Sequence, residues 1–200
     1  MPTSQVQLNE EEQEEQEEKK PLSYRLLESR SILIAEPVSK ELAERVTTQL
    51  LLLDQDDDSE PINIYINSPG GDVDAGFAIF DMARYISAPV RCISNGLTAS
   101  AAVVILLAAP KERRFSLPNS RFLMHQPSTG VRGTTADIKI EANEIVKIRE
   151  KINELIAEET GQDVEKVQED TRRNYWIDAE EASEYGLITK ILNHKSDLDS

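Results

Sequence analysis

The sequence predicts a single α/β domain in which short strands alternate with helices. Short runs typical of strands occur at 31–35, 62–66 and 90–93. Each is followed by a segment expected to be helical, and the first of these segments has apolar residues at helical spacing. A chain of 200 residues is also long enough to bury one core of this kind. We therefore expect strands joined through helices by right-handed crossovers.

The first half of the domain is expected to begin with the strand 31–35. The helix 38–53 follows, because apolar residues recur there at helical spacing, at Val38, Leu42, Val46, Leu50 and Leu53. The acidic segment 54–60 is expected to form a loop. The next elements in order are a strand at 62–66, a turn at 68–71, a helix at 74–86, a strand at 90–93 and a helix from about residue 99.

A long helix dominates the second half of the prediction. Two strands, at 113–116 and 122–124, precede it. The helix covers 134–159 and ends before Gly161, a residue typical of the position just past a helix. Two shorter helices and a strand complete the domain, at 163–171, 179–185 and 187–192.

Both ends of the chain are predicted to lie outside the folded domain. Residues 9–20 are charged or amide side chains with no apolar face, so 1–20 is expected to be a disordered acidic tail. A binding arm or a removable pro-segment is the alternative for this tail. The folded domain is expected to span 21–193, and a polar tail to cover 194–200.

Charge and composition exclude several classes of function. A net charge of −15 argues against nucleic acid or an anionic membrane as a partner. The chain has one cysteine, Cys92, so no disulfide can form within it. Cys92 lies in an apolar run typical of a buried strand. The apolar stretch 99–109 is too short to cross a bilayer, and the acidic N-terminus does not resemble a signal peptide. We expect a cytoplasmic protein.

The turn around Pro69-Gly-Gly71 precedes a predicted helix. Two glycines at this point leave backbone N–H groups pointing outward at the positive end of the helix dipole, where they suit a developing oxyanion. The alternative is a tight turn that binds nothing. The sequence argues against a phosphate-binding loop, because no Gly-Lys-Ser/Thr sequence follows.

A serine and a histidine form the candidate catalytic pair. Ser100 lies among small residues where a predicted strand gives way to a helix, and His125 ends a later apolar run. A serine nucleophile needs a nearby base, and the one other histidine, His194, lies in the polar C-terminal tail. The N–H after the serine, that of Ala101, is a second candidate oxyanion donor. Taken alone, Ser100 also fits close helix packing and His125 also fits a structural role.

Together, these segments resemble the Clp protease proteolytic subunits, a family of self-compartmentalised serine peptidases. The resemblance extends from about residue 22 to residue 192, and no single motif carries it. The matching segments are Tyr65-Ile-Asn-Ser-Pro-Gly-Gly71, Ala75-Gly-Phe-Ala-Ile-Phe-Asp81, Leu117-Pro-Asn-Ser-Arg121, Met124-His-Gln-Pro127, Ala136-Asp-Ile138, Glu158-Glu-Thr-Gly161 and Ala179-Glu-Glu-Ala-Ser-Glu-Tyr-Gly-Leu187, together with the small residues around Ser100.

The resemblance implies a fold of repeated ββα units with a protruding handle helix, and it also implies catalytic roles. Ser100 is the expected nucleophile and His125 its general base. Gly71, with Gly70 shaping the turn, and Ala101 are the expected backbone oxyanion donors. The segment 128–133 and the helix after it correspond to the handle that interlocks two rings.

The family also implies an assembly and a set of partners. Two stacked heptameric rings enclose a chamber, and a ring-shaped AAA+ unfoldase docks on it and delivers unfolded polypeptides. Because ATP is used by the unfoldase, the chain itself is expected to need no cofactor and no metal.

The chain departs from the family pattern behind the histidine. Where the family has the aspartate of the catalytic triad, this chain has the neutral Asn174. An asparagine carbonyl can orient the imidazole but cannot stabilise the imidazolium as a carboxylate does, so reduced or conditional activity is expected. Asp170 or Asp178 would supply a carboxylate instead if the loop were rearranged. Arg172 stands where the family usually has an acidic or polar residue, near the ring–ring contact.

Two further departures affect the substrate pocket and the axial pore. Ala101 stands where the family commonly has methionine, which reshapes the adjacent pocket and keeps the backbone donor. The acidic run 9–20 precedes a shortened pore-lining region, so several such tails would concentrate negative charge at the pore.

Two other functions stay open at this point. Asn174 and the unusual N-terminus favour a weakly active or regulatory ring subunit, mixed with a second Clp proteolytic paralogue. A crotonase-type enzyme acting on acyl thioesters is the remote alternative, because that related fold also uses a Gly-Gly oxyanion turn. The sequence shows no basic patch for the nucleotide phosphate of such a substrate.

Overall fold

The computed structural model describes residues 21–127, 130 and 132–198. The acidic segment 1–20 lies outside the described residues, and its disorder stays a prediction. Residues 128, 129 and 131, in the segment expected to begin the handle, also lie outside them, as do 199–200.

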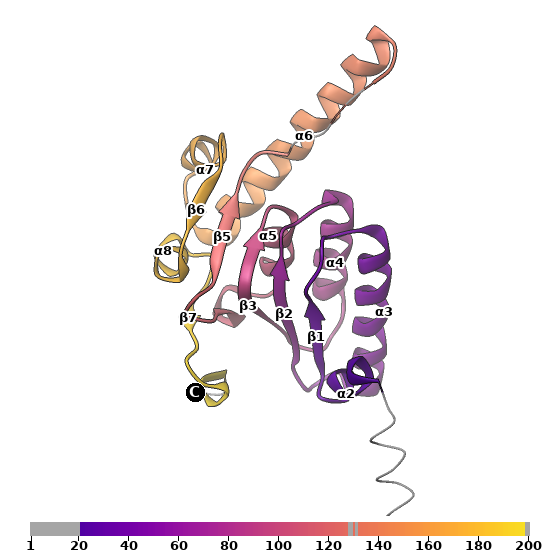
Figure 1. The fold of residues 1–200 in the computed structure, drawn as a ribbon, viewed down its shortest axis with the longest axis vertical. Helices are drawn as coiled ribbons and strands as arrows, with labels where there is room; N and C mark the ends of the chain where they lie inside the picture. The colour runs from indigo at the N-terminus through magenta and orange to yellow at the C-terminus, as the bar shows by residue number, and fades with distance from the viewer. Residues whose placement is uncertain (1–20, 128–129, 131, 199–200) are drawn as a thin grey trace, which may run out of the picture.

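The described strands form one mostly parallel sheet (Figure 1). Its main path is parallel throughout and runs in the order β1 (Ser31–Ile34), β2 (Ile62–Ser68), β3 (Val90–Ala99), β4 (Arg114–Ser116) and β7 (Lys190–Ile191). Beside the second half of β3 lies the parallel strand β5 (Arg121–Met124), and β5 pairs antiparallel with β6 (Tyr175–Ile177). The predicted α/β class is confirmed.

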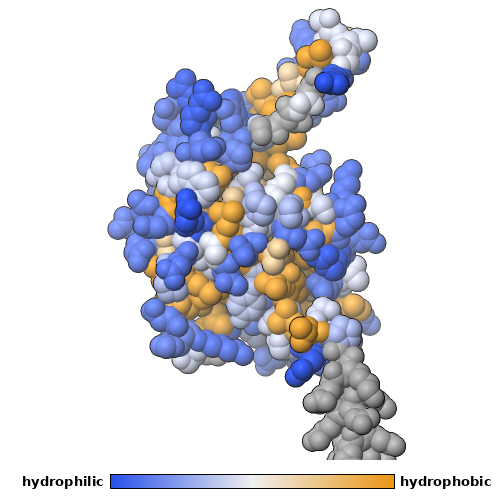
Figure 2. Space-filling model, in the orientation of Figure 1, coloured by the Kyte–Doolittle hydropathy of each residue, from blue (hydrophilic) through white to orange (hydrophobic). Residues whose placement is uncertain are grey.

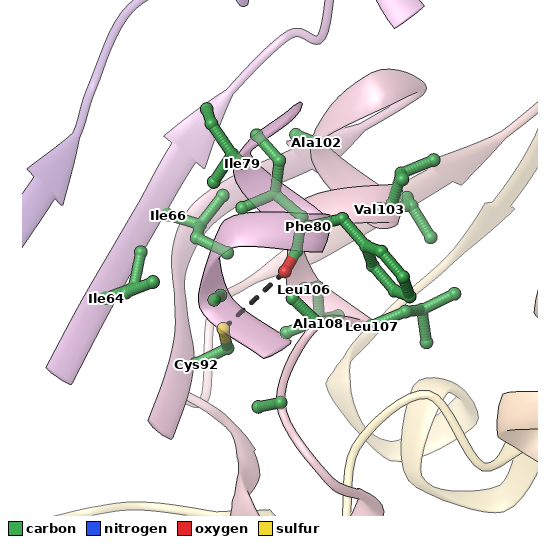
Figure 3. Packing of buried hydrophobic residues seen from close by; sticks show 14 of the residues in the cluster. Ile64, Ile66, Ile79, Phe80, Cys92, Ala102, Val103, Leu106, Leu107 and Ala108 are labelled. Carbon is green, nitrogen blue, oxygen red and sulfur yellow. Dashed lines mark hydrogen bonds between the residues drawn. The ribbon is translucent and has the colours of Figure 1, made fainter. Parts of the chain in front are cut away.

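Three helices cover one face of the sheet, α3 (Lys40–Asp56), α4 (Val73–Tyr85) and α5 (Ala101–Leu106) (Figure 1). The sequence of β2 gives the reason, because its isoleucines alternate with more polar residues along the strand. Ile64 and Ile66 are fully buried and belong to the same core as Ile79 of α4 and Leu106 of α5 (Figure 3). A short helix, α2 (Leu22–Glu28), packs beside β1.

The longest helix, α6 (Thr135–Thr160), projects from the body as an arm (Figure 1). Its outer part exposes Ile138, Ile140 and Val146, and Figure 2 shows hydrophobic residues along this arm. Its other end is fixed to the body through the buried residues Asn153, Ile156 and Thr160. This helix is the protruding handle that the sequence predicted. Two short helices, α7 (Val164–Asp170) and α8 (Ala179–Tyr185), flank β6 in the chain.

Several predicted boundaries around the sheet are wrong. Strand β3 was expected to end at residue 93, but it continues to Ala99, and α5 begins two residues later. Helix α3 begins at Lys40 and not at Val38, because the Ser39 side chain caps it by accepting the Leu42 N–H at 3.2 Å. Val38 instead forms a parallel bridge with Gly71.

Other differences lie near the two ends of the described chain. Neither α2 nor β6 was predicted. The strand expected at 187–192 is reduced to Lys190–Ile191, because Leu187 and Ile188 still complete the C-terminal turn of α8. Within the expected polar tail, Lys195–Leu198 form a short 3₁₀ helix, η2.

Candidate active site

Ser100 occupies a strained turn between β3 and α5. Its φ is 55° and its ψ is −122°, a backbone conformation that a residue with a side chain rarely adopts. Such strain costs about 1–3 kcal/mol and persists where the surrounding structure enforces it, often at functional sites. The Ser100 N–H donates to the Leu123 carbonyl of β5 at 2.8 Å, so the turn is fixed to the strand that leads to the histidine.

The Gly70–Gly71 turn packs directly on this serine. The φ of Gly70 is +83°, and a Cβ on it would lie 2.7 Å from the Ser100 Cβ and 3.0 Å from the Ala101 nitrogen. The parallel bridge to Val38 uses the Gly70 carbonyl and the Asp72 N–H, both at 2.9 Å, and leaves the Gly71 N–H out of the bridge. Only glycine allows so close an approach between the two turns.

Two backbone positions expected to act as donors lie near the serine. Ala101 is the first residue of α5, so the helix offers no carbonyl acceptor for its N–H. The Gly70–Gly71 turn, which carries the second expected donor, lies against this same helix start. The structure therefore brings together Gly70, Gly71 and Ala101. From the sequence, Gly71 and Ala101 are the expected oxyanion donors, and Gly70 is the residue expected to shape the turn.

Ser100 and His125 line the same small pocket, at the junction of α5, β5 and the base of α6. Its remaining walls are almost entirely apolar and consist of Val73, Ala101, Val103, Val104, Met124, Pro127, Ile152 and Ile156. No hydrogen bond joins the Ser100 hydroxyl to the His125 ring in the described chain. Catalytic contacts of this kind are often long without substrate and shorten in the bound complex.

Asn174 lies at the same end of the β5–β6 strand pair as His125. β5 and β6 are antiparallel, and Met124 opposite Tyr175 is the last pair of their ladder, so His125 and Asn174 both lie just beyond it. The Asn174 side chain is exposed and makes no hydrogen bond to His125 in this conformation of the described chain. The structure therefore places the expected triad position at the same end of the strand pair as the histidine, and its catalytic role stays a prediction.

The sequence missed the contacts that hold the segment before Asn174. The Gln126 N–H donates to the Thr171 carbonyl at 2.8 Å, and its side-chain amide donates to the Arg172 carbonyl at 3.0 Å. Thr171 Oγ1 in turn donates to Oδ1 of the buried Asn153 at 3.0 Å. The one signal in the sequence was Asn153 itself, a short polar side chain on the apolar side of the long helix.

Neither neighbouring aspartate is free to replace Asn174. Asp170 accepts hydrogen bonds from the Tyr185 hydroxyl at 2.9 Å and from the Lys166 ammonium at 2.6 Å. Burial, with this bond to Asp170, raises the pKa of the Tyr185 hydroxyl. Asp178 caps α8 by accepting the Glu181 N–H at 2.9 Å. Both carboxylates have structural partners, so the structure does not support the rearranged-loop alternative.

Metal-binding clusters and membrane-spanning helices are both absent from the described ranges. No cluster of three or more His, Cys, Asp or Glu side chains there is arranged to hold a metal ion. In the same part of the chain, no helix has both the length and the apolar character needed to cross a membrane.

Known proteins share this sequence and this fold. The family model described as "Clp protease" matches residues 13–195. "ATP-dependent Clp protease proteolytic subunit 2" of Treponema denticola is 52% identical over 190 residues, 95% of each chain. "ATP-dependent Clp protease proteolytic subunit 3" of Rhizobium etli is 47% identical over 195 residues, 96% of this chain and 100% of the relative.

A solved structure agrees with these relatives. A point mutant of ClpP1 from Listeria monocytogenes superposes with a TM-score of 0.82 at 44% identity, over 89% of this chain and 99% of that one. The crotonase-type alternative finds no support in these matches. With a family match over most of its length, this chain belongs to the Clp protease family of serine peptidases.

Proposed function

We propose that this chain is a proteolytic subunit of an ATP-dependent Clp protease and hydrolyses peptide bonds of unfolded proteins through an acyl-enzyme on Ser100. One observation carries the proposal: the strained Ser100 turn packs on the Gly70–Gly71 turn and lines one pocket with His125. A nucleophile, a base and a site for the oxyanion thus lie together.

The first half-reaction forms the acyl-enzyme. Ser100 Oγ attacks the carbonyl carbon of the scissile bond while His125 takes the hydroxyl proton. The Gly71 and Ala101 N–H groups stabilise the negative charge on the substrate oxygen. As the tetrahedral intermediate collapses, the C–N bond breaks, and His125 gives its proton to the leaving amine.

The second half-reaction returns the free enzyme. A water molecule attacks the ester carbonyl while His125 takes one of its protons, and the same two N–H groups hold the new oxyanion. Collapse breaks the bond to Ser100 Oγ, which recovers its proton from His125. The products are a carboxylate and an amine, and no cofactor or metal is needed in this chain.

Asn174 sets the rate of both steps in this proposal. Its carbonyl oxygen can orient the His125 ring, but a neutral side chain stabilises the imidazolium much less than a carboxylate does. In a serine protease of another fold, the same Asp-to-Asn exchange lowers kcat about 10⁴-fold. We therefore infer low intrinsic activity.

The pocket beside Ser100 indicates the substrate class. Its walls include Val73, Val104, Met124 and Ile156, all apolar, whereas a buried charge would find no partner there. Peptide bonds that follow apolar residues are the expected cleavage sites.

Assembly into rings is part of the proposal. Hydrophobic side chains are exposed on α2, β1, α3 and α4, and more are exposed on the arm of α6; they are Leu22, Tyr24, Leu33, Leu51, Leu52, Tyr85, Ile138, Ile140 and Val146. Figure 2 shows such residues over α2 and along the arm. Contacts with other subunits would bury these side chains. Two stacked heptameric rings in the cytoplasm, served by a AAA+ unfoldase, are the inferred working state.

A second candidate follows from the neutral residue behind the histidine. Asn174 favours a weakly active or regulatory ring that works together with a more active Clp proteolytic paralogue. Arg172 at the expected ring–ring contact is consistent with this candidate, because two copies facing each other would bring like charges together.

The mass of the purified assembly, recorded together with peptidase activity on the same sample, separates the two candidates. A tetradecamer that hydrolyses an apolar fluorogenic peptide, with activity lost in Ser100→Ala, supports an active subunit. Activity that emerges only after a proteolytic paralogue is added supports the regulatory ring. Unchanged hydrolysis in Ser100→Ala overturns the proposed mechanism in both cases.

A further inference from the structure

Strand β3 contains a bulge just before the serine turn. Its residue Ser94 pairs with Ile66 of β2, and its residue Thr98 pairs with Ser68. Between these pairs β3 advances from 94 to 98 while β2 advances from 66 to 68, so β3 accommodates two extra residues. Before the bulge β3 pairs with β4, and after it β3 pairs with β5, which leads to His125.

Side chains from two other segments hold the bulge in place. Asn67 of β2 accepts the Leu97 N–H on its Oδ1 at 3.0 Å. The Ser120 hydroxyl accepts the Gly96 N–H at 3.2 Å and donates to the Ser94 carbonyl at 2.9 Å. These bonds satisfy backbone groups that the regular strand pairing leaves unpaired at the bulge.

The bulge fits the Asn67 side chain closely. The φ of Gly96 is +109°, and a Cβ on this glycine would lie 2.9 Å from Asn67 Oδ1. The hydroxyls of Ser94 and Thr98 are 2.8 Å apart across the bulge, and both residues are fully buried. A side chain at position 96 would therefore displace the Asn67 side chain from this bulge.

Asn67 links the two turns of the active site. Gly70 follows Asn67 of β2 by three residues, and Ser100 follows Leu97 of β3 by the same number. The Asn67–Leu97 hydrogen bond therefore fixes one strand against the other just before both turns begin. A shift of β3 at this bond would move Ser100 relative to the Gly71 N–H.

We propose that Asn67 is a positioning residue for acyl transfer. Its side-chain carbonyl acts through the Leu97 N–H to set the offset between the Gly70–Gly71 turn and Ser100. This inference rests on the proposed function, in which Ser100 is the nucleophile. Asn67 itself is exposed and acts through the backbone of β3.

Three variants, compared as assembled protein, test the role of Asn67. Asn67→Ala leaves the Leu97 N–H without its acceptor, and the rate constant for acylation of Ser100 by a fluorophosphonate probe is expected to fall about 10- to 100-fold. For an apolar peptide, kcat falls by a similar factor and KM is unchanged. Asn67→Asp keeps an acceptor oxygen and is expected to retain acylation within about threefold of wild type. Asn119→Ala, an exposed asparagine in the β4–β5 turn, serves as the matched control and keeps the wild-type rate.

Each alternative result has a defined meaning. Wild-type acylation in Asn67→Ala overturns the inference and leaves the proposed function intact, as does a raised KM with unchanged kcat. If Asn67→Ala does not assemble, Asn67→Gln displaces the carbonyl by one methylene and keeps the amide, and a wild-type rate in that variant overturns the inference as well. If wild-type Ser100 is not acylated in any assembled state, the proposed function fails and this inference fails with it.

Discussion

Gly70 lies in contact with the nucleophile turn, so that a Cβ on Gly70 would lie 2.7 Å from the Cβ of Ser100 and would also collide with the Ala99 carbonyl oxygen. This contact joins two parts of the chain that carry different halves of the proposed chemistry. The glycine turn supplies an oxyanion donor, and the serine turn supplies the nucleophile and the other donor.

The first prediction concerns this contact. In Gly70→Ala the added methyl must push the two turns apart, which moves the Gly71 N–H away from the substrate oxygen. Loss of one oxyanion donor costs about 10²–10³ in kcat, so peptide hydrolysis should fall by at least about 100-fold. Steady-state kinetics on the assembled variant measures this effect.

Gly161→Ala is the matched control for Gly70→Ala. Gly161 also has a positive φ, of +79°, but no atom lies within 4 Å of the Cβ that it would gain. The strain alone should lower the free energy of unfolding by about 1 kcal/mol and leave kcat unchanged. Equal losses of activity in both variants would mean that backbone strain, and not contact with Ser100, explains the result.

The second prediction concerns Asn174, which precedes β6, the strand paired antiparallel with the one that leads to His125. Asn174→Asp supplies the charge that stabilises the imidazolium, so kcat should rise by about 10²- to 10⁴-fold. Peptide hydrolysis by the assembled variant checks this. The same exchange at the exposed Asn119 should change nothing, and an unchanged rate in Asn174→Asp would show that this position does not limit the chemistry.

The third prediction concerns an ion triad at the base of the handle, in which one member, Arg114, is buried. Glu159 of α6 bonds to the Arg114 guanidinium at 2.8 Å and to that of Arg84 at 2.5 Å, and Arg114 is only 1% exposed. Burial lowers the pKa of Arg114, and Glu159 opposes this shift. Glu159→Gln leaves the buried Arg114 charge uncompensated and should lower the free energy of unfolding by about 3–5 kcal/mol.

Denaturant unfolding at fixed subunit concentration measures the loss in Glu159→Gln. Glu158→Gln, one residue away on an exposed position, is the control and should remain within about 0.5 kcal/mol of wild type. Similar stabilities for the two variants would show that the triad adds little to the anchoring of α6.

The fourth prediction concerns Cys92, which lies deep in the core with its Sγ directed at the Ile105 carbonyl at 3.6 Å (Figure 3). Burial raises the pKa of the Cys92 thiol from 9.0 to about 12. The unfolded chain therefore releases this proton at a lower pH than the folded chain does. The resulting stability is complete below pH 9 and is lost as the pH rises toward 12, by up to about 1.4 kcal/mol per pH unit.

The comparison of wild type with Cys92→Ala isolates the contribution of Cys92. The difference between their free energies of unfolding should be constant from pH 7 to about pH 9 and should then fall as the pH rises. A difference that stays constant to about pH 11 would contradict the assigned pKa.

Local patterns in the sequence predicted most of the layers of the fold. The short run 62–66 was predicted as a strand, and the spacing of Leu42, Val46 and Leu50 predicted an amphipathic helix, as the structure shows. Both patterns depend on side chains within one element, which is why sequence alone was sufficient.

The shape of the site depends on contacts between elements, and sequence patterns did not predict it. β3 continues to Ala99 because Asn67 and Ser120, from other segments, accept hydrogen bonds from its bulge. Val38 has the right helical spacing, yet its bridge to Gly71 keeps it outside α3. Ser100, His125 and Asn174 were selected from the sequence as candidate catalytic residues, and their catalytic roles stay proposals.

Acylation of Ser100 tests the central claim most directly. The assembled protein would be treated with a fluorophosphonate probe, and the modified peptide would be located by mass spectrometry, with Ser100→Ala and His125→Ala treated in parallel. The proposed mechanism predicts a single adduct on Ser100 in the wild type, no adduct in Ser100→Ala, and labelling slowed by orders of magnitude in His125→Ala. An unlabelled Ser100 in every assembled state, or equal labelling without His125, would contradict it.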